Sequence, residues 1–156
     1  MELKDKAAVI TGGDSGIGFA SARLFLEAGA DVVLISNNPE TLGVARGQLG
    51  TKVVTIDADV TDTKALGAAF AEVGRQFGHI DVLFASAGVV FPTPLEGASS
   101  ELFERILRIN VAGSFYTVQA ALPYLRTGSS VILIGSVVAT MGIAGFGAYA
   151  ASKRKA

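Results

Sequence analysis

Residues 7–18 read Ala7-Ala8-Val9-Ile10-Thr11-Gly12-Gly13-Asp14-Ser15-Gly16-Ile17-Gly18, and this stretch decides the fold. An apolar run leads into a glycine-rich turn, and a largely apolar segment follows from Phe19 to Ala28. This pattern predicts a strand, a tight turn and a helix. Glycine lets the backbone turn sharply and approach a ligand, and the free N–H groups of a helix N-terminus attract phosphate. The glycine spacing differs from the usual Gly-x-Gly-x-x-Gly fingerprint, so by itself the stretch also fits an ordinary strand-to-helix turn.

The composition limits the classes of function. Half of the 156 residues are hydrophobic and 17% are charged, so we expect one globular domain over residues 1–156. The net charge of −1 argues against nucleic acid as a main partner. There is no cysteine, which excludes disulfides and cysteine-bound metals. We expect no metal site, and we expect the single histidine, His79, to lie in a turn.

The segment 127–152 carries no charge and is long enough to cross a bilayer. Glycines and serines interrupt it repeatedly, so a buried strand followed by a glycine-rich loop fits it better. No signal peptide is recognisable at the start. We therefore expect a cytoplasmic protein with no membrane contact.

Apolar runs alternate with helical segments along the chain. We expect strands near 7–11, 32–35, 52–56, 80–85 and 130–134. We expect helices near 15–28, 38–50, 63–77 and 99–126, with a last helical stretch near 147. Asn38-Pro39-Glu40 is typical of a helix start, and Pro123 should weaken the end of the long helix. The alternation predicts a doubly wound α/β fold, with a parallel sheet in the order 3-2-1-4-5.

Ligands of such sheets bind outside the carboxyl ends of the strands, so the residues that follow each strand are candidates. Ser36-Asn37-Asn38 follows the second strand with neither the acid typical of NAD sites nor the arginine typical of NADP sites. Asp14 would oppose a 2′-phosphate unless it points away, so the choice between NAD and NADP stays open. Asp59, after the third strand, either accepts a hydrogen bond from adenine or serves as a residue at the helix start. Ala85-Ser86-Ala87-Gly88 either lets a cofactor pass close by or forms a plain turn.

The residues after the fifth strand suggest proton chemistry. Tyr149 and Lys153 are four residues apart, which places them on one face of a helix. A phenol is a poor acid or base near neutral pH, but a neighbouring cation favours its ionised form. Ser136 could polarise a carbonyl group or hold an alcohol. Tyr-x-x-x-Lys is common by chance, and its place at this sheet edge gives it weight.

Taken together, these motifs resemble those of the short-chain dehydrogenase/reductase family. The resemblance rests on the turn from Thr11 to Gly18, Asp59-Val60, Ala85-Ser86-Ala87-Gly88, Asn110 in Ile109-Asn110-Val111, Ser136, Tyr149 and Lys153. It implies a Rossmann-type fold with NAD or NADP as cofactor. It also implies hydride transfer between the nicotinamide and a small alcohol or carbonyl substrate.

The resemblance assigns roles to individual residues. Tyr149 would be the general acid or base, and Lys153 would assist it and bind the nicotinamide ribose. Ser136 would hold the substrate oxygen, and Asn110 would support a proton relay, although as a mid-helix asparagine it is also compatible with a plain surface position. The implied cofactor-binding residues are Gly12, Asp14, Ser15, Gly16, Ile17, Gly18, Ser36, Asn37, Asp59, Val60, Ser86, Ala87, Gly88, Tyr149 and Lys153.

The chain departs from the family pattern in three ways. Ser86 stands where the family usually has asparagine, and Asn37 stands where many relatives have a basic residue. The sequence ends three residues after Lys153, where family members continue into two more strands, so we expect a C-terminally truncated chain. This keeps an alternative open, a non-catalytic NAD(P)-binding module. An exposed fifth strand and an apolar long helix predict a homo-oligomer.

Overall fold

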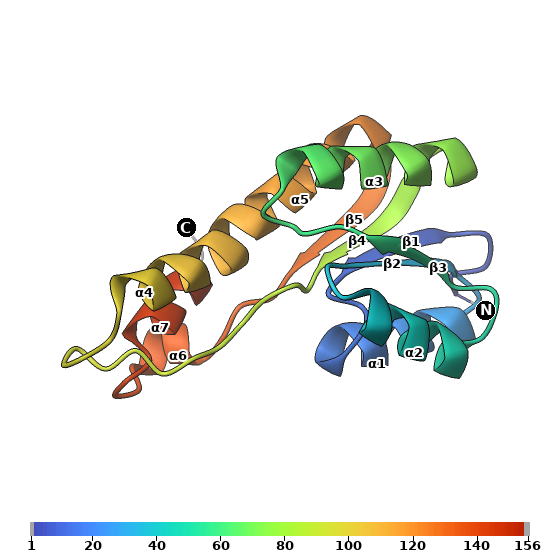
Figure 1. The fold of residues 1–156 in the computed structure, drawn as a ribbon. Coiled ribbons are helices and arrows are strands. Elements are labelled where there is room, and N and C mark those ends of the chain that lie inside the picture. The colour runs from blue at the N-terminus through green and yellow to red at the C-terminus, as the bar shows by residue number, and fades with distance from the viewer. Residues whose placement is uncertain (1, 155–156) are drawn as a thin grey trace.

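The computed structural model describes residues 2–154, and its centre is a parallel five-stranded sheet. The order is β3-β2-β1-β4-β5, as the sequence predicts (Figure 1). The strands are β1 (Ala7–Thr11), β2 (Asp31–Ser36), β3 (Val54–Asp57), β4 (Ile80–Ala85) and β5 (Leu125–Leu133). Their registers place Val9 beside Val33 on one side and Leu83 on the other, so the three central strands end at one edge.

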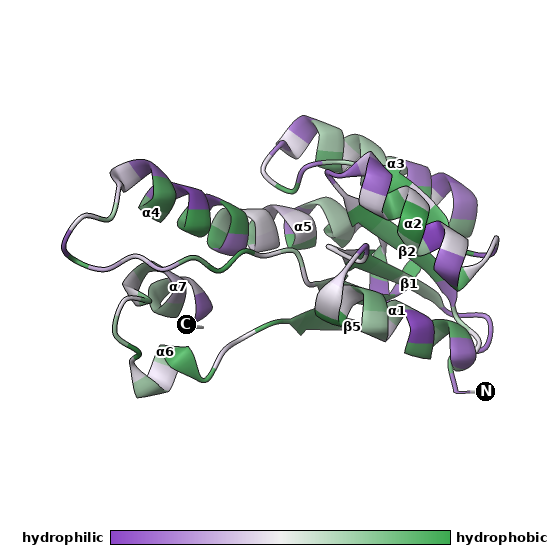
Figure 2. Ribbon diagram, turned by 60° about the horizontal axis from the view of Figure 1, so that its bottom comes forward, coloured by the Kyte–Doolittle hydropathy of each residue, from purple (hydrophilic) through white to green (hydrophobic). Residues whose placement is uncertain are grey.

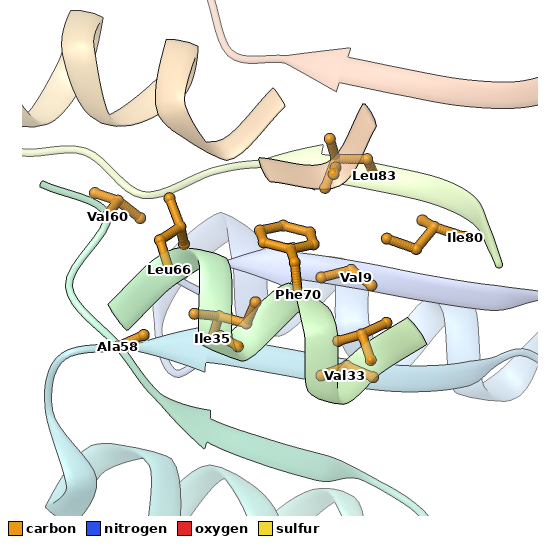
Figure 3. Close-up of a cluster of buried hydrophobic side chains, with 12 residues drawn as sticks. Val9, Val33, Ile35, Ala58, Val60, Leu66, Phe70, Ile80 and Leu83 are labelled. Carbon is orange, nitrogen blue, oxygen red and sulfur yellow. The ribbon is translucent and has the colours of Figure 1, made fainter. Parts of the chain in front are cut away.

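Helices cover both faces of the sheet. Figure 1 shows α1 (Gly16–Glu27) and α2 (Pro39–Leu49) on one face, and α3 (Thr63–Phe77) and α5 (Ser114–Ala121) on the other. Successive side chains of a strand point to opposite faces, and the core divides accordingly. Alternate residues of β1 and β2 pack with Leu66 and Phe70 of α3 (Figure 3), and the residues between them pack towards α1 and α2.

The predicted helix boundaries hold where the sequence carries clear caps. Asn38 accepts hydrogen bonds from the backbone N–H groups of Glu40 (3.1 Å) and Thr41 (3.2 Å). Helix α2 begins at Pro39, the residue after this cap. Asp62 caps α3 in the same way. His79 lies in the turn between α3 and β4, which confirms that prediction.

The predicted long helix near 99–126 runs without a break from Ser100 to Tyr124, but it is not α-helical throughout. It consists of α4 (Ser100–Leu107), a π-helical turn η1 (Arg108–Gly113), α5 and a 3-10 turn η2 (Leu122–Tyr124). Proline lacks the N–H group that a helix interior needs, and α5 ends at Ala121, two residues before Pro123. The last strand therefore begins at Leu125 rather than near 130, with an irregular register opposite Ile80 to Val82. β3 likewise begins at Val54, two residues later than expected.

The last elements lie beyond the carboxyl ends of the strands. There α6 (Val138–Met141) contacts α7 (Gly147–Lys153), and α7 packs against α4 (Figure 2). β5 is an edge strand of the described sheet, and Val131, Ile132 and Leu133 are 40–43% exposed. None of the helices described over residues 2–154 is long and apolar enough to cross a membrane. The uncharged segment near 127–152 forms strand, loops and short helices instead.

A buried carboxylate joins three strands at the amino end of the sheet. Asp81 accepts hydrogen bonds from the N–H group of Ala7 (3.0 Å), the ammonium group of Lys6 (3.1 Å) and the guanidinium group of Arg126 (2.9 Å). Nε2 of His79 lies 3.2 Å from the same carboxylate. Burial raises the pKa of Asp81, but the hydrogen bonds and the charge of Lys6 outweigh it and hold the pKa well below its usual range.

Candidate active site

A cavity of about 430 Å³ lies at the carboxyl edge of the sheet, where the strand order reverses. Every residue that the sequence assigns to cofactor binding lines it, except Gly18. The lining residues are Gly12, Asp14, Ser15, Gly16, Ile17, Ile35, Ser36, Asn37, Ala58, Asp59, Val60, Ser86, Ala87, Gly88, Val89, Val90, Arg105, Ile109, Ile134, Tyr149 and Lys153. The cavity thus extends from the turn between β1 and α1 to α7.

The glycine turn is built for close approach of backbone to backbone. Gly12 has a φ of +64°, and a Cβ atom there would lie 2.8 Å from the Cα atom of Ala87. Gly16 has a φ of +53° and faces open space. A Cβ atom on Gly18 would collide with the carbonyl oxygen of Gly12, so Gly18 serves the packing of α1 beneath the turn rather than the cavity wall.

The N-terminus of α1 lies at the cavity and has no side-chain cap. Ser15 stands at the N-cap position, but its side chain makes no capping hydrogen bond. By contrast, side chains cap α2, α3 and α4. The first-turn N–H groups of a helix have no partners within the helix, and here Gly16 and Ile17 line the cavity. Such N–H groups and the positive end of the helix dipole suit a pyrophosphate.

Two carboxylates lie on the side of the cavity near β2 and β3. Asp14 accepts a hydrogen bond of 2.7 Å from the hydroxyl group of Thr41 on α2. Asp59 accepts hydrogen bonds from the N–H and hydroxyl groups of Thr61 (2.7 and 2.8 Å) and from the side-chain amide of Asn37 (2.8 Å).

Asp59 is therefore held in its ionised form. Burial raises the pKa of Asp59, but its hydrogen bonds and the charge of Arg108 outweigh that effect and leave the pKa below its usual value. Asp62, not Asp59, caps the following helix. Asp59 lies in the turn just before α3, and it also lines the cavity.

Tyr149 and Lys153 lie on one face of α7, and both line the cavity. Nζ of Lys153 is 5.8 Å from the centre of the Tyr149 ring, and Lys153 is only 9% exposed. A Cβ atom on Gly88 would lie 3.4 Å from Nζ of Lys153, so glycine keeps this approach open. A cation and a phenol thus lie side by side at the cavity wall.

Asn110 is buried (4% exposed) in the π-helical turn, so the surface reading of this residue is wrong. Its side-chain oxygen accepts from the N–H group of Val89 (2.8 Å), and its amide donates to the carbonyl of Val89 (2.9 Å) and to Oγ of Ser152 (2.9 Å). Ser152 in turn donates to the carbonyl of Tyr149 (2.8 Å). Asn110 does not itself line the cavity. Its side chain links the loop after β4 to α7.

Two further predicted positions differ from expectation in their surroundings. Ser136 lies in the loop after β5 and is not among the lining residues, and its Oγ accepts a hydrogen bond of 3.3 Å from the N–H group of Val138. Ser86 lines the cavity, but the loop after β4 is joined to β1 by Thr11, whose hydroxyl oxygen lies 3.4 Å from the N–H group of Ala87.

Several residues that line the cavity belong to none of the motifs recognised in the sequence. Most are apolar residues near the carboxyl end of a strand, in the loop after it or in η1, namely Ile35, Ala58, Val89, Val90, Ile109 and Ile134. Arg105 also lines the cavity and lies over the ring of Phe91, at 5.5 Å from its centre. Its spacing of four residues from Ile109 was a signal that both share one helix face. Among residues 2–154, no group of three or more His, Asp or Glu side chains is placed to hold a metal ion.

Comparison with known proteins identifies the class to which this fold and cavity belong. The short chain dehydrogenase family model matches residues 6–155, so the chain belongs to the short-chain dehydrogenase family. Oxidoreductase asL5 of Sarocladium schorii is 37% identical over 98% of this chain, and versicolorin reductase 1 of Aspergillus parasiticus is 34% identical over 97%.

Solved structures agree closely in fold. A short-chain dehydrogenase/reductase, glucose/ribitol dehydrogenase, from Brucella melitensis has a TM-score of 0.93 and 34% identity over 98% of this chain. An NAD+-bound xylitol dehydrogenase has a TM-score of 0.92 and 30% identity over 98% of this chain. The chain spans 62% and 60% of the two relatives and 66% and 61% of the two structures. The family and the NAD+-bound neighbour support a nicotinamide dinucleotide as the class of cofactor.

Proposed function

We propose that this chain carries the cofactor site and the proton-transferring residues of an NAD(P)-dependent oxidoreductase, which moves a hydride between the nicotinamide and a small alcohol or carbonyl compound. The observation that carries the proposal is that one cavity is lined by both the glycine turn and the Tyr149–Lys153 pair. The turn and the uncapped helix fit a pyrophosphate, and the pair fits proton transfer.

Each residue then has a defined task. The bound nicotinamide supplies or accepts the hydride. Tyr149 exchanges a proton with the substrate oxygen, and the ammonium group of Lys153 stabilises the ionised phenol. Lys153 also binds the nicotinamide ribose. Asn110 holds α7 to the loop after β4 through Ser152, and a proton relay through its side chain remains a prediction.

Ser136 is proposed to bind the substrate oxygen once its loop turns the hydroxyl group towards the cavity. Its hydroxyl oxygen interacts at 3.3 Å with the backbone of its own loop, a weak contact that a substrate could replace. Ser136→Ala is expected to raise the KM for the substrate and leave the affinity for NADH unchanged. A loss of NADH affinity in this variant would contradict the assignment.

We further propose that the site prefers NAD to NADP. The lining residues near the ends of β2 and β3 include Asp14 and Asp59, and the two lining cations, Arg105 and Lys153, come from α4 and α7. Asn37, which stands where a basic residue would bind a 2′-phosphate, donates to Asp59 instead. A phosphate with a charge near −2 would be repelled by these carboxylates.

A second candidate function is cofactor binding without turnover. It is favoured by the position of Ser136 outside the cavity lining. The two candidates are distinguished by incubating the purified chain with NADH or NAD+ and a panel of small ketones and alcohols. Turnover above the rate of a Tyr149→Phe sample supports the oxidoreductase, and saturable cofactor binding with no turnover supports the binding module.

We also propose that the chain associates with itself. β5 is an edge strand of the described sheet and exposes apolar side chains, and Phe115 on α5 and Leu122 after it are more than half exposed. Light scattering of the purified chain is expected to give a mass above 16.0 kDa. A monomeric mass at working concentration would contradict this.

A further inference from the structure

The loop between β4 and α4 reaches across the carboxyl edge of the sheet to the start of α7. Thr93 in this loop is buried (6% exposed) and forms an isolated parallel bridge with Phe146, the residue just before α7. Its N–H group donates to the carbonyl of Gly145 at 2.5 Å. Two segments that lie more than 50 residues apart in the sequence are thus joined at the helix that carries Tyr149.

The helix itself lacks a cap at this end. Its N-cap residue is Phe146, which makes no side-chain capping hydrogen bond. The hydroxyl oxygen of Thr93 fills this role from the other segment, because it accepts a hydrogen bond of 3.2 Å from the N–H group of Ala148. Ala148 is the second residue of α7, and its N–H is one of those that a capping side chain normally satisfies.

α7 needs such support because it has only seven residues. Isolated helices of this length are unstable in water, so contacts from other elements must hold it. The second support is at its far end, where Ser152 accepts from Asn110. Asn110 also binds both backbone groups of Val89, so one loop, residues 89–93, is tied to α7 at both ends.

We propose that Thr93 is a positioning residue for the reaction. It caps α7 from the loop after β4 and so fixes the first turn of the helix, where Tyr149 lies next to the cavity. This inference rests on the proposed oxidoreductase function. It adds a residue that is not among those lining the cavity.

Two substitutions separate the hydroxyl group from the shape of the side chain. Thr93→Val keeps the branched shape but removes the hydrogen-bond acceptor, and Thr93→Ser keeps the acceptor. The first measurement is amide hydrogen exchange of the full chain by NMR. We expect the Ala148 amide to exchange about tenfold faster in Thr93→Val and within about twofold of the original rate in Thr93→Ser. Amides of β1 serve as the internal control, and an unchanged Ala148 rate in Thr93→Val would overturn the cap.

The second measurement is the pH dependence of NAD(H)-dependent turnover in the same three proteins. If the cap positions Tyr149, Thr93→Val lowers kcat about tenfold, shifts the pH profile of kcat upward and leaves the KM for NADH within about threefold. Thr93→Ser restores kcat and the pH profile. An unshifted pH profile, or a serine variant as impaired as the valine variant, would refute the positioning role. Absence of turnover in the unmodified chain would refute the proposed function and this role with it, whereas the exchange rates would still decide whether Thr93 caps α7.

Discussion

The amino and carboxyl ends of the same sheet differ in what their polar groups bind. At the amino end, the buried carboxylate of Asp81 is satisfied by the protein itself, through the backbone of β1 and through Lys6 and Arg126. At the carboxyl end, the side chain of Ser15 makes no capping hydrogen bond to α1. Nothing lies within 4 Å of where a Cβ atom on Gly16 would be. Groups satisfied internally contribute stability, whereas groups left for a ligand contribute binding.

This difference predicts that changes at the two ends have separate consequences. A change at the amino end should alter the free energy of unfolding and leave NADH affinity unchanged. A change at the carboxyl end should alter NADH affinity or turnover, whatever it does to stability. An amino-end variant that weakens NADH binding would contradict the division.

The largest expected effect is on turnover at the carboxyl end. Tyr149→Phe removes the proposed proton donor and should lower kcat about a thousandfold, while NADH affinity stays within about threefold. Steady-state kinetics with a small ketone and a fluorescence titration measure the two quantities. Tyr116→Phe, a tyrosine packed against the core, is the matched control. Unchanged turnover in Tyr149→Phe would refute the role of this residue.

The next effect is on stability at the amino end. Asp81→Asn should lower the free energy of unfolding by roughly 2 kcal/mol at pH 7, because charged hydrogen bonds are lost next to half-exposed cations. Folding lowers the pKa of Asp81. Its contribution to the free energy of unfolding is therefore complete above the pKa of an unfolded aspartate, about 4. It is lost as the pH falls through the lower pKa of the folded state.

Urea unfolding of both proteins at pH 7 and near pH 3 tests this sign. The stability difference between them should be smaller at the lower pH. Asp31→Asn, an exposed acid at the start of β2, is the control and should change stability by less than about 0.5 kcal/mol. A difference that grows on acidification would contradict the role of Asp81.

A substitution in the glycine turn should weaken binding. Gly12→Ala places a Cβ atom against the Cα atom of Ala87 at a φ of +64°, so the loop after β4 must move away from the turn. We expect about a tenfold loss of NADH affinity and roughly 1–2 kcal/mol of lost stability. Gly43→Ala in α2, where nothing lies within 4 Å of the new Cβ atom, is the control and should not destabilise the chain. Full affinity in Gly12→Ala would show that the turn does not hold the cofactor.

The smallest expected effect is on the choice of cofactor. Asn37→Arg places a cation beside Asp14 and Asp59 and should narrow the NADH-to-NADPH affinity ratio about tenfold. Parallel titrations with both cofactors measure the ratio. Asn37→Gln keeps the amide without adding charge and should leave the ratio unchanged. An equal change in both variants would show that charge is not the cause.

The sequence predicts the fold well where one pattern determines an element. The apolar runs give the central strands and their order, and Asn38-Pro39 gives the start of α2. The glycine turn and the Tyr149–Lys153 spacing give most of the cavity wall, because residues that follow parallel strands meet at one edge.

The remaining features depend on contacts between distant segments. The burial of Asn110 follows from the π-helical turn and from its bonds to Val89 and Ser152, which helix periodicity does not reveal. Thr93 caps a helix that begins 54 residues later, and nothing local to the threonine indicates it. β5 begins early because the α-helix before it ends ahead of Pro123.

The most direct test of the difference between the two ends is a fluorescence titration of the purified chain with NADH, and in parallel with NADPH. We expect saturable binding of NADH, at least tenfold weaker binding of NADPH, and loss of NADH affinity in Gly12→Ala but not in Asp81→Asn. Absence of saturable binding of either cofactor would contradict the claim that the carboxyl edge of this sheet is a dinucleotide site.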